Sequence, residues 1–430
     1  MAHNTDIQLR QQIIYSIYVR AHTPEGTFRA VEADLDRIKA LGTDIIWFLP
    51  IHPIGVKGKK GSLGCPYANR DYRTVNPEYG TMEDFQHLVD AIHARGMKCI
   101  IDVVYNHTSP DSTLVEIHPE FFYHKPDGSM GNHVGDWTDV VDLDYTSCRE
   151  LWDYQIESLK MWAGIVDGFR CDVASFVDVE FWCEARTAVE TVRPGCIWLA
   201  GTVHSGFATA ARQMGLYCCN DYEMFRAFDM EYDYDIREVF DRYLKGQCNL
   251  SNYLDVINFQ ESLYPANYIK MRCLENHDNP RICHYVQDTV ALENFTAFLY
   301  FLKGTTLLYA GQEYCCAHTP SLFEKEVFSR NPKTDISSML IKLNRMKKEL
   351  LSADDSLLAS GDDKTDIAVL LRRNSKTQKL GIFSLKGTSG TVSIRFPDGS
   401  YHNQLSGEIV TVKNGTVTCT GKPIVITANA

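Results

Sequence analysis

The chain has 430 residues, 44% of them hydrophobic and 11% aromatic, enough to bury a core larger than that of a single small domain. Its formal net charge of −12 argues against a nucleic-acid partner, because binding to phosphates depends on excess positive charge. No apolar run is long enough to span a bilayer, and Met1–Arg10 lacks the basic and then apolar layout of a signal peptide. We therefore expect a cytoplasmic protein, or one from which a leader has been trimmed.

The fourteen cysteines bear on the same question. They are spread through expected strands and helices, and two pairs are adjacent, at 218–219 and 315–316. No C-x-x-C pair or Cys/His array has the spacing of a zinc site. We expect buried, reduced thiols, as in a cytoplasmic protein.

Strands and helices alternate along the first part of the chain. Apolar runs predict strands at 13–19, 44–49, 98–104, 166–171, 196–200, 215–219, 269–274 and 305–310. Helical patterns lie at 27–41, 81–95, 147–164, 178–192, 289–303 and 337–351, and two more within about 235–260. Such alternation predicts parallel strands with right-handed crossovers, so we expect an α/β fold, a closed (β/α)8 TIM barrel. An open doubly wound sheet is the alternative, weakened by the absence of a G-x-G-x-x-G or Walker loop.

Two stretches depart from the alternation. Residues 107–146 are irregular and long for a loop, so we expect a short inserted domain after strand 3. After residue 354 the texture changes to short alternating segments separated by turns. We therefore divide the chain into a barrel at 1–106 and 147–354, an inserted subdomain at 107–146, and a C-terminal antiparallel β-sandwich domain at 355–430.

Polar clusters follow three of the predicted strands, at 102–107, 170–172 and 275–278. A barrel would bring them together, because the C-terminal ends of its strands meet at one face. Arg170 and Asp172 are two residues apart and point to the same face of a strand, where the cation favours an ionised carboxylate that can act as a nucleophile. A purely structural Arg–Asp pair is the simpler reading of such a motif alone. A metal site is disfavoured, because no H-x-H or H-x-x-E-H spacing appears.

These motifs resemble the α-amylase family of retaining glycosidases, glycoside hydrolase family 13. The resemblance covers essentially the whole chain. It rests on five segments in the right order, namely 67–72 (YANRDY), 102–107 (DVVYNH), 142–144 (DLD), 168–172 (GFRCD) and 276–278 (NHD).

The resemblance implies a role for each matching residue. Asp172 would be the nucleophile that forms a glycosyl-enzyme, held ionised by Arg170, and Asp278 would bind sugar hydroxyls and distort the ring. The remaining substrate-binding residues would be a stacking tyrosine, two histidines that donate to hydroxyls, and a supporting aspartate: Tyr67, His107, His277 and Asp102. Without the family pattern, His107 reads equally well as a core histidine, and Tyr67 as a surface aromatic.

One departure from the family concerns the general acid. A retaining glycosidase needs a second carboxyl group, and the family places a Glu at the end of strand five, where this chain has Gly201. Glu184 and Glu190 lie on the preceding helix, and we expect His204 to lie beyond reach of the strand end. We therefore predict that the chain cleaves natural glycosidic bonds slowly or not at all. Either the Glu was removed deliberately, or the chain is a natural pseudoenzyme, or the alignment is shifted and hides the acid.

The function expected from the resemblance is a retaining α-glycosidase acting on α-glucans or malto-oligosaccharides. The alternatives are a non-catalytic glycan-binding protein of the same fold and an α-1,6-glucosidase or transglycosylase. An aldolase or metal-dependent hydrolase would want a Schiff-base lysine or a metal cluster at the strand ends, and neither appears. We expect no cofactor; calcium is doubtful, although Asn106 could coordinate it. The short insertion suggests a fairly open cleft.

Overall fold

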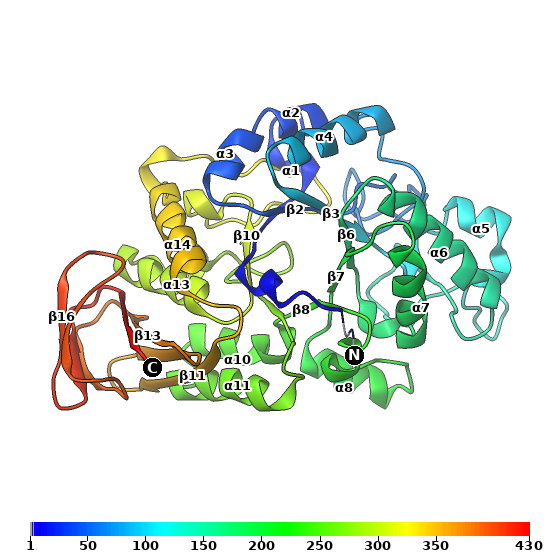
Figure 1. Ribbon diagram of the computed structural model, residues 1–430. Coiled ribbons are helices and arrows are strands. Elements are labelled where there is room, and N and C mark those ends of the chain that lie inside the picture. Colours follow the sequence, from blue (N-terminus) through cyan, green and yellow to red (C-terminus); the bar gives the residue numbers. More distant parts are fainter. Residues whose placement is uncertain (1, 3) are drawn as a thin grey trace.

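The computed structural model describes residue 2 and residues 4–430, and within them eight parallel strands close into a barrel (Figure 1). Around the ring the strands follow one another as β1, β10, β9, β8, β7, β6, β3 and β2. Their bounds are β1 Ile13–Ile17, β2 Ile45–Phe48, β3 Lys98–Val103, β6 Gly168–Cys171, β7 Ile197–Ala200, β8 Met230–Tyr232, β9 Lys270–Arg272 and β10 Thr305–Tyr309. The expected TIM barrel is confirmed, and the open sheet is excluded.

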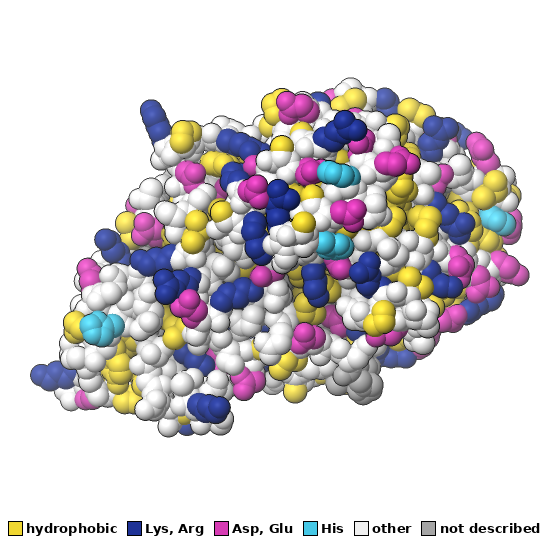
Figure 2. All heavy atoms as spheres, turned by 45° about the horizontal axis from the view of Figure 1, so that its top comes forward, with side chains coloured by type: hydrophobic (Ala, Val, Ile, Leu, Met, Phe, Trp, Pro, Cys, Tyr) yellow, Lys and Arg dark blue, Asp and Glu magenta, His cyan; other side chains and the backbone are white. Residues whose placement is uncertain are grey.

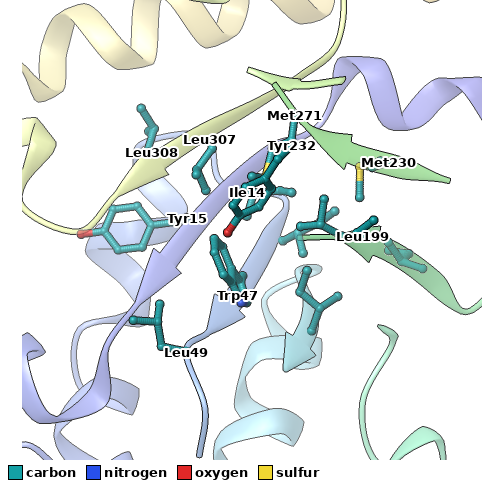
Figure 3. Close-up of a cluster of buried hydrophobic side chains, with 14 of the residues drawn as sticks. Ile14, Tyr15, Trp47, Leu49, Leu199, Met230, Tyr232, Met271, Leu307 and Leu308 are labelled. Carbon is teal, nitrogen blue, oxygen red and sulfur yellow. The ribbon is translucent and has the colours of Figure 1, made fainter. Parts of the chain in front are cut away.

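The barrel interior is filled by large apolar side chains. Figure 3 shows Ile14, Trp47, Leu199, Tyr232 and Met271, which come from five different strands and lie together inside the ring. Outside the ring, helices cover the other face of each strand, so almost every strand residue is buried. Burial on both faces explains why these strands read as continuous apolar runs rather than alternating ones.

Helices form the outer layer of the barrel. Their bounds are α1 Val19–His22, α2 Phe28–Glu32, α3 Leu35–Ala40, α4 Met82–Ala94, α6 Arg149–Ala163, α7 Val179–Glu190, α8 Ser205–Gln213, α9 Asp221–Met224, α10 Tyr234–Leu244, α11 Leu250–Leu263, α12 Ile282–Tyr285, α13 Thr289–Phe301 and α14 Ser337–Leu350. A capping box at Thr81 and Asp84 begins α4, with each side chain accepting from the other residue's backbone N–H. The single helix expected at 27–41 is instead two, separated at Ala33 and Asp34.

The sixth strand of the barrel is not where the sequence predicted it. Residues 216–220 form no regular structure, and the strand is Met230–Tyr232. Its middle residue, Glu231, is fully buried and forms an ion pair of 3.2 Å with Lys270 of β9, the next strand. A charged residue inside a three-residue strand hides the apolar signal, whereas Leu216–Cys219 is apolar but lies in a loop.

The two remaining parts of the chain contain short elements. Between β3 and α6 lie a small hairpin of β4 (His107–Thr108) with β5 (Val141–Asp142), and the helix α5 (Thr113–Ile117). At the C-terminus four antiparallel strands form one sheet and four more form two small ribbons, which lie at the lower left in Figure 1. Their bounds are β11 Ser356–Asp362, β12 Ile367–Arg373, β13 Thr377–Ser384, β14 Gly390–Ser393, β15 Gly399–His402, β16 Ile409–Val412, β17 Thr416–Cys419 and β18 Ile424–Asn429. The C-terminal antiparallel sheets expected from the sequence are confirmed.

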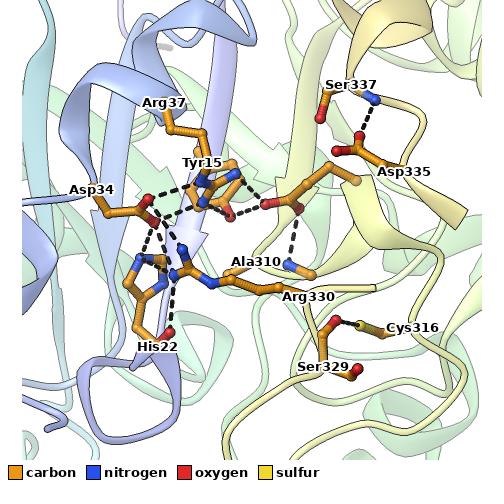
Figure 4. Close-up of polar contacts among 12 residues, drawn as sticks. Tyr15, His22, Asp34, Arg37, Ala310, Cys316, Ser329, Arg330, Asp335 and Ser337 are labelled. Atoms are coloured by element: carbon orange, nitrogen blue, oxygen red, sulfur yellow. Dashed lines mark hydrogen bonds and ion pairs between the residues drawn. The ribbon is translucent and has the colours of Figure 1, made fainter. Parts of the chain in front are cut away.

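A partly buried ion network joins the segment after β10 to the first helices (Figure 4). Asp34 accepts from Arg37 at 2.7 Å, from Arg330 at 3.0 Å and from the ring of His22 at 2.8 Å. Arg37 also pairs at 2.7 Å with Glu313, which follows β10. Contacts between segments so far apart in sequence fix the loop after β10, which borders the site described next.

The surface carries charges of both signs. Figure 2 shows Lys, Arg, Asp and Glu side chains intermingled on the face drawn, without a large patch of one sign. Among the described residues no helix has both the length and the apolar character needed to cross a bilayer. All fourteen cysteines are free thiols in this structure.

Candidate active site

Arg170 lies at the centre of the polar cluster at the C-terminal end of the barrel. Its Nη1 donates to both carboxylate oxygens of Asp102, each at 2.9 Å, and to Asp172 Oδ1 at 2.7 Å. Register brings these groups together, because Asp102 on β3 stands beside Arg170 on β6. The guanidinium is buried and lies 5.0–5.7 Å from the ring centroids of Trp47, Tyr67 and Tyr232. Asp172 therefore accepts a charged hydrogen bond that fixes its orientation.

Tyr67 and His277 form a second layer around Asp102. The Tyr67 hydroxyl donates to Asp102 Oδ2 at 2.9 Å and lies 2.7 Å from Nε2 of His277, and the two rings stack with centroids 5.6 Å apart. Burial raises the pKa of Asp102, and the ion pair with Arg170 opposes that rise. Burial also lowers the pKa of His277. Asp102 and His277 thus hold Tyr67 and Arg170 in place from behind.

A cavity of ≈ 390 Å³ opens in front of these residues. That volume is within the range of small-molecule sites. Its lining includes six of the eight residues predicted from the sequence, namely Tyr67, His107, Arg170, Asp172, Gly201 and Asp278. The other two, Asp102 and His277, lie behind the lining, where they contact Tyr67. The barrel therefore gathers the three sequence clusters as expected.

Gly201 continues the strand pairing beside Asp172. Its N–H donates to the Cys171 carbonyl at 2.8 Å, and its own carbonyl accepts from Ala174 N–H at 3.0 Å. The register of β6 with β7 pairs Arg170 with Leu199, so Gly201 stands next to Asp172. A Cβ at Gly201 would lie 2.7 Å from Arg170 Nη2 and 2.9 Å from the Cys171 oxygen. The guanidinium therefore fills the space that a side chain at 201 would enter.

The cavity also contains residues that were not predicted as site residues, among them Tyr234, His204 and Trp137. Tyr234 donates its hydroxyl to Asp278 Oδ2 at 2.8 Å, and His204 stacks on the Tyr234 ring at 4.3 Å between centroids. Trp137, from the segment between β3 and α6, lies over His107 at 5.4 Å between centroids. Tyr234 was missed because it follows β8, the strand whose position was predicted wrongly. For Trp137 the sequence did offer a signal, namely the many aromatic residues in 107–146.

His204, which we expect to lie beyond reach of the strand end, lines the same cavity as Asp172. Burial lowers the pKa of His204, which favours the neutral ring near neutral pH. Glu184 and Glu190 are remote, as expected: the first pairs with Arg149 at the surface, and the second accepts from a nearby backbone N–H. The only carboxylates that line the cavity, among the described residues, are those of Asp136, Asp139, Asp172 and Asp278.

Asn106 and the nearby Asp142 both contact histidine side chains. The Asn106 amide lies 3.1 Å from Nδ1 of its neighbour His107. Nearby Asp142 is engaged by His133, whose backbone N–H and ring Nδ1 lie 2.7 and 2.8 Å from Oδ2. Across the described part of the chain, no group of three or more His, Cys, Asp or Glu side chains is arranged to hold a metal.

A closed parallel barrel with an Arg-paired aspartate, a second aspartate and sugar-sized space at the strand ends defines the class of barrel enzymes that act on carbohydrates. The family comparison agrees. Residues 4–121 and 135–349 match the model of the alpha amylase catalytic domain, and residues 359–426 match the bacterial alpha amylase C-terminal domain. The chain therefore belongs to the α-amylase family.

Solved structures and curated relatives give the same family. The chain is similar to an alpha-amylase from Lactobacillus plantarum, with 42% identity and a TM-score of 0.93 over 98% of this chain and 100% of that one. A noncanonic maltogenic alpha-amylase from Thermotoga neapolitana is 31% identical, with a TM-score of 0.87 over 98% of this chain and 100% of that one. An alpha-1,4-glucan:maltose-1-phosphate maltosyltransferase from Streptomyces coelicolor is 26% identical over 87% of this chain. The matched part covers only 58% of that protein's length.

Proposed function

We propose that this member of the α-amylase family is a retaining α-glycosidase scaffold for α-1,4-glucans or malto-oligosaccharides, with Asp172 as nucleophile and without its general acid. The observation that carries the proposal is the 2.7 Å contact of Arg170 Nη1 with Asp172 Oδ1 at the wall of the cavity. This contact holds the carboxylate at the wall of the cavity, where a sugar would bind. The maltogenic amylase and the maltosyltransferase among the relatives favour α-1,4-glucans as ligands.

The position of Gly201 supports the loss of the acid. The register of β6 with β7 puts residue 201 beside Asp172, at the strand end where a retaining enzyme of this family needs its second carboxyl group. No carboxylate replaces it on β7. General acid catalysis contributes about 10²–10⁴-fold, and the sugar alkoxide is a poor leaving group. Glycosidic bonds should therefore be cleaved slowly by this chain.

A second candidate is a glycan-binding protein without turnover. It is favoured by the same glycine, because the binding residues Tyr67, His107 and Asp278 are all in place while the acid is not. A transglycosylase is the third possibility, and it would differ in the acceptor that takes the sugar from Asp172 rather than in the first step.

The test uses a leaving group that needs no proton. α-Maltosyl fluoride should glycosylate Asp172, and fluoride release with an added maltosyl mass on the intact protein should be observed. The intermediate should persist, because the missing Glu would also be the base that activates water. Azide, a nucleophile that needs no base, should accelerate turnover, and added maltose should do so if transfer is the native reaction.

Asp172→Asn is the matched control and should form no adduct. If the unmodified chain forms no adduct but binds maltoheptaose, the glycan-binding function is correct. If it neither reacts with the fluoride nor binds malto-oligosaccharides, the proposed function is overturned.

A further inference from the structure

The loops around the mouth of the cavity are joined to one another. The loop after β2 meets the segment between β3 and α6 through Lys60, whose Nζ donates to the Asp136 carbonyl at 2.6 Å and lies 3.2 Å from Asp139 Oδ1. Lys60, Asp136 and Asp139 all line the cavity. The Asp139 side chain is buried, so Lys60 closes this side with a charged pair rather than leaving a groove.

Aromatic contacts continue the ring on the opposite side. Trp137 meets Phe207 of α8 with centroids 6.1 Å apart, which joins the segment after β3 to the loop after β7. His204 of the β7 loop stacks on Tyr234 after β8, and Tyr234 is bonded to Asp278 after β9. All five side chains line the cavity. This side is therefore a continuous wall.

Hydrogen bonds complete the ring. The loops after β9 and β10 are joined by Thr319 Oγ1, which donates to the Asn279 carbonyl at 3.3 Å. The loop after β10 returns to the loop after β2 where Leu63 N–H donates to the Phe323 carbonyl at 3.1 Å. Phe323 itself lines the cavity. Each loop of the rim described here is thus in contact with the next.

We infer that the cavity is a blind pocket that binds the end of an α-glucan chain and does not admit the middle of one. A chain that passed through the site would need an open groove on two sides, and the ring of contacts leaves only the mouth above Asp172. The open cleft expected from the short insertion does not form, because Lys60 and Trp137 bridge the gap that a short insertion leaves. This inference rests on the proposed function, since it assigns the binding mode of the same site.

Lys60 and Phe207 are the contacts best suited to opening the ring. The Lys60 side chain is 36% exposed, and ion pairs so exposed contribute little to stability, so its removal should leave the fold intact. Lys60→Ala would break the bridge to Asp136 and Asp139, and Phe207→Ala would remove the contact with Trp137. Lys57→Ala on the same loop is the matched control, because Lys57 does not line the cavity.

The experiment compares two ligands by calorimetry. Maltoheptaose and β-cyclodextrin contain the same number of α-1,4-linked glucose units, but the ring has no chain end. The unaltered protein should bind maltoheptaose and bind β-cyclodextrin at least about tenfold more weakly, a difference of roughly 1.4 kcal/mol. The ratio of the β-cyclodextrin dissociation constant to that of maltoheptaose should be smaller in Lys60→Ala, in Phe207→Ala and in the double variant. It should be unchanged in Lys57→Ala.

Equal affinity of the unaltered protein for the linear and cyclic ligands would overturn the blind pocket while leaving the proposed function in place. Binding of neither ligand would overturn the proposed function, and the inference with it. If the ratio of the two dissociation constants stays the same in the double variant, the contacts between the rim loops do not set the selectivity for chain ends. That result would also overturn the inference.

Discussion

Restoring a carboxyl group at residue 201 should restore cleavage. We predict that Gly201→Glu raises the rate of reducing-sugar release from malto-oligosaccharides by about 10²–10⁴-fold, the usual contribution of a general acid. At 1.36 kcal/mol per factor of ten, this corresponds to about 2.7–5.4 kcal/mol of transition-state stabilisation. The assay is reducing-sugar release at matched enzyme concentration, with maltoheptaose binding measured in parallel.

The structure also gives the obstacle to this variant. The new Cβ would lie 2.7 Å from Arg170 Nη2, so the guanidinium must move by a few tenths of an ångström. This movement should be tolerated, because the bonds to Asp102 and Asp172 run through Nη1, and Nη2 would gain the new carboxylate as a partner. The backbone carbonyl oxygen of Cys171, 2.9 Å from the new Cβ, is less able to move. This contact therefore sets how much the variant loses in stability.

Two control variants separate the effects. Gly201→Ala introduces the crowding alone, and Gly201→Gln adds a side chain of the same size that cannot donate a proton as an acid. Both should remain as slow as the parent. Activity of Gly201→Gln equal to that of Gly201→Glu would refute the role of the carboxyl group. A folded Gly201→Glu that binds maltoheptaose but stays inactive would refute the assignment of residue 201.

Three further predictions concern stability. Arg170→Met leaves Asp102 buried without its cation and should lower the free energy of unfolding by about 3–5 kcal/mol in urea titrations; a loss below about 1 kcal/mol would contradict the pairing. Burial lowers the pKa of His52 to about 4 from an ordinary 6.5, because the buried ring is held neutral. The contribution of this neutral ring to the free energy of unfolding is therefore complete above pH 6.5. It declines as the pH falls to 4, by up to about 3 kcal/mol. In His52→Gln the free energy of unfolding should therefore fall less steeply between pH 6.5 and pH 4. An unchanged slope would argue against a buried neutral His52 as the cause. Thr81→Ala removes the N-terminal cap of α4 and should cost about 1 kcal/mol by thermal denaturation, whereas Thr187→Ala, inside α7, should cost clearly less.

The sequence was sufficient for the architecture because its signals are local. Apolar runs mark strands that are buried on both faces, and Thr81 with Asp84 marks a helix start. It also located the clusters at Asp102, Arg170 and Asp278, because chemistry in a barrel lies at the C-terminal ends of the strands. It failed at Met230–Tyr232, where the buried Glu231 depends on a lysine on a neighbouring strand.

Only the tertiary structure decided how the site is enclosed. The bridge from Lys60 to Asp136, and the contact of Trp137 with Phe207, join segments that are far apart in sequence and have no shared pattern. The crowding at Gly201 likewise depends on where Arg170 lies across the strand pair. The sequence alone was enough to propose which residues carry the chemistry, because the motifs that contain them are local. The shape of the pocket is a property of loop contacts, which exist only once the barrel has closed.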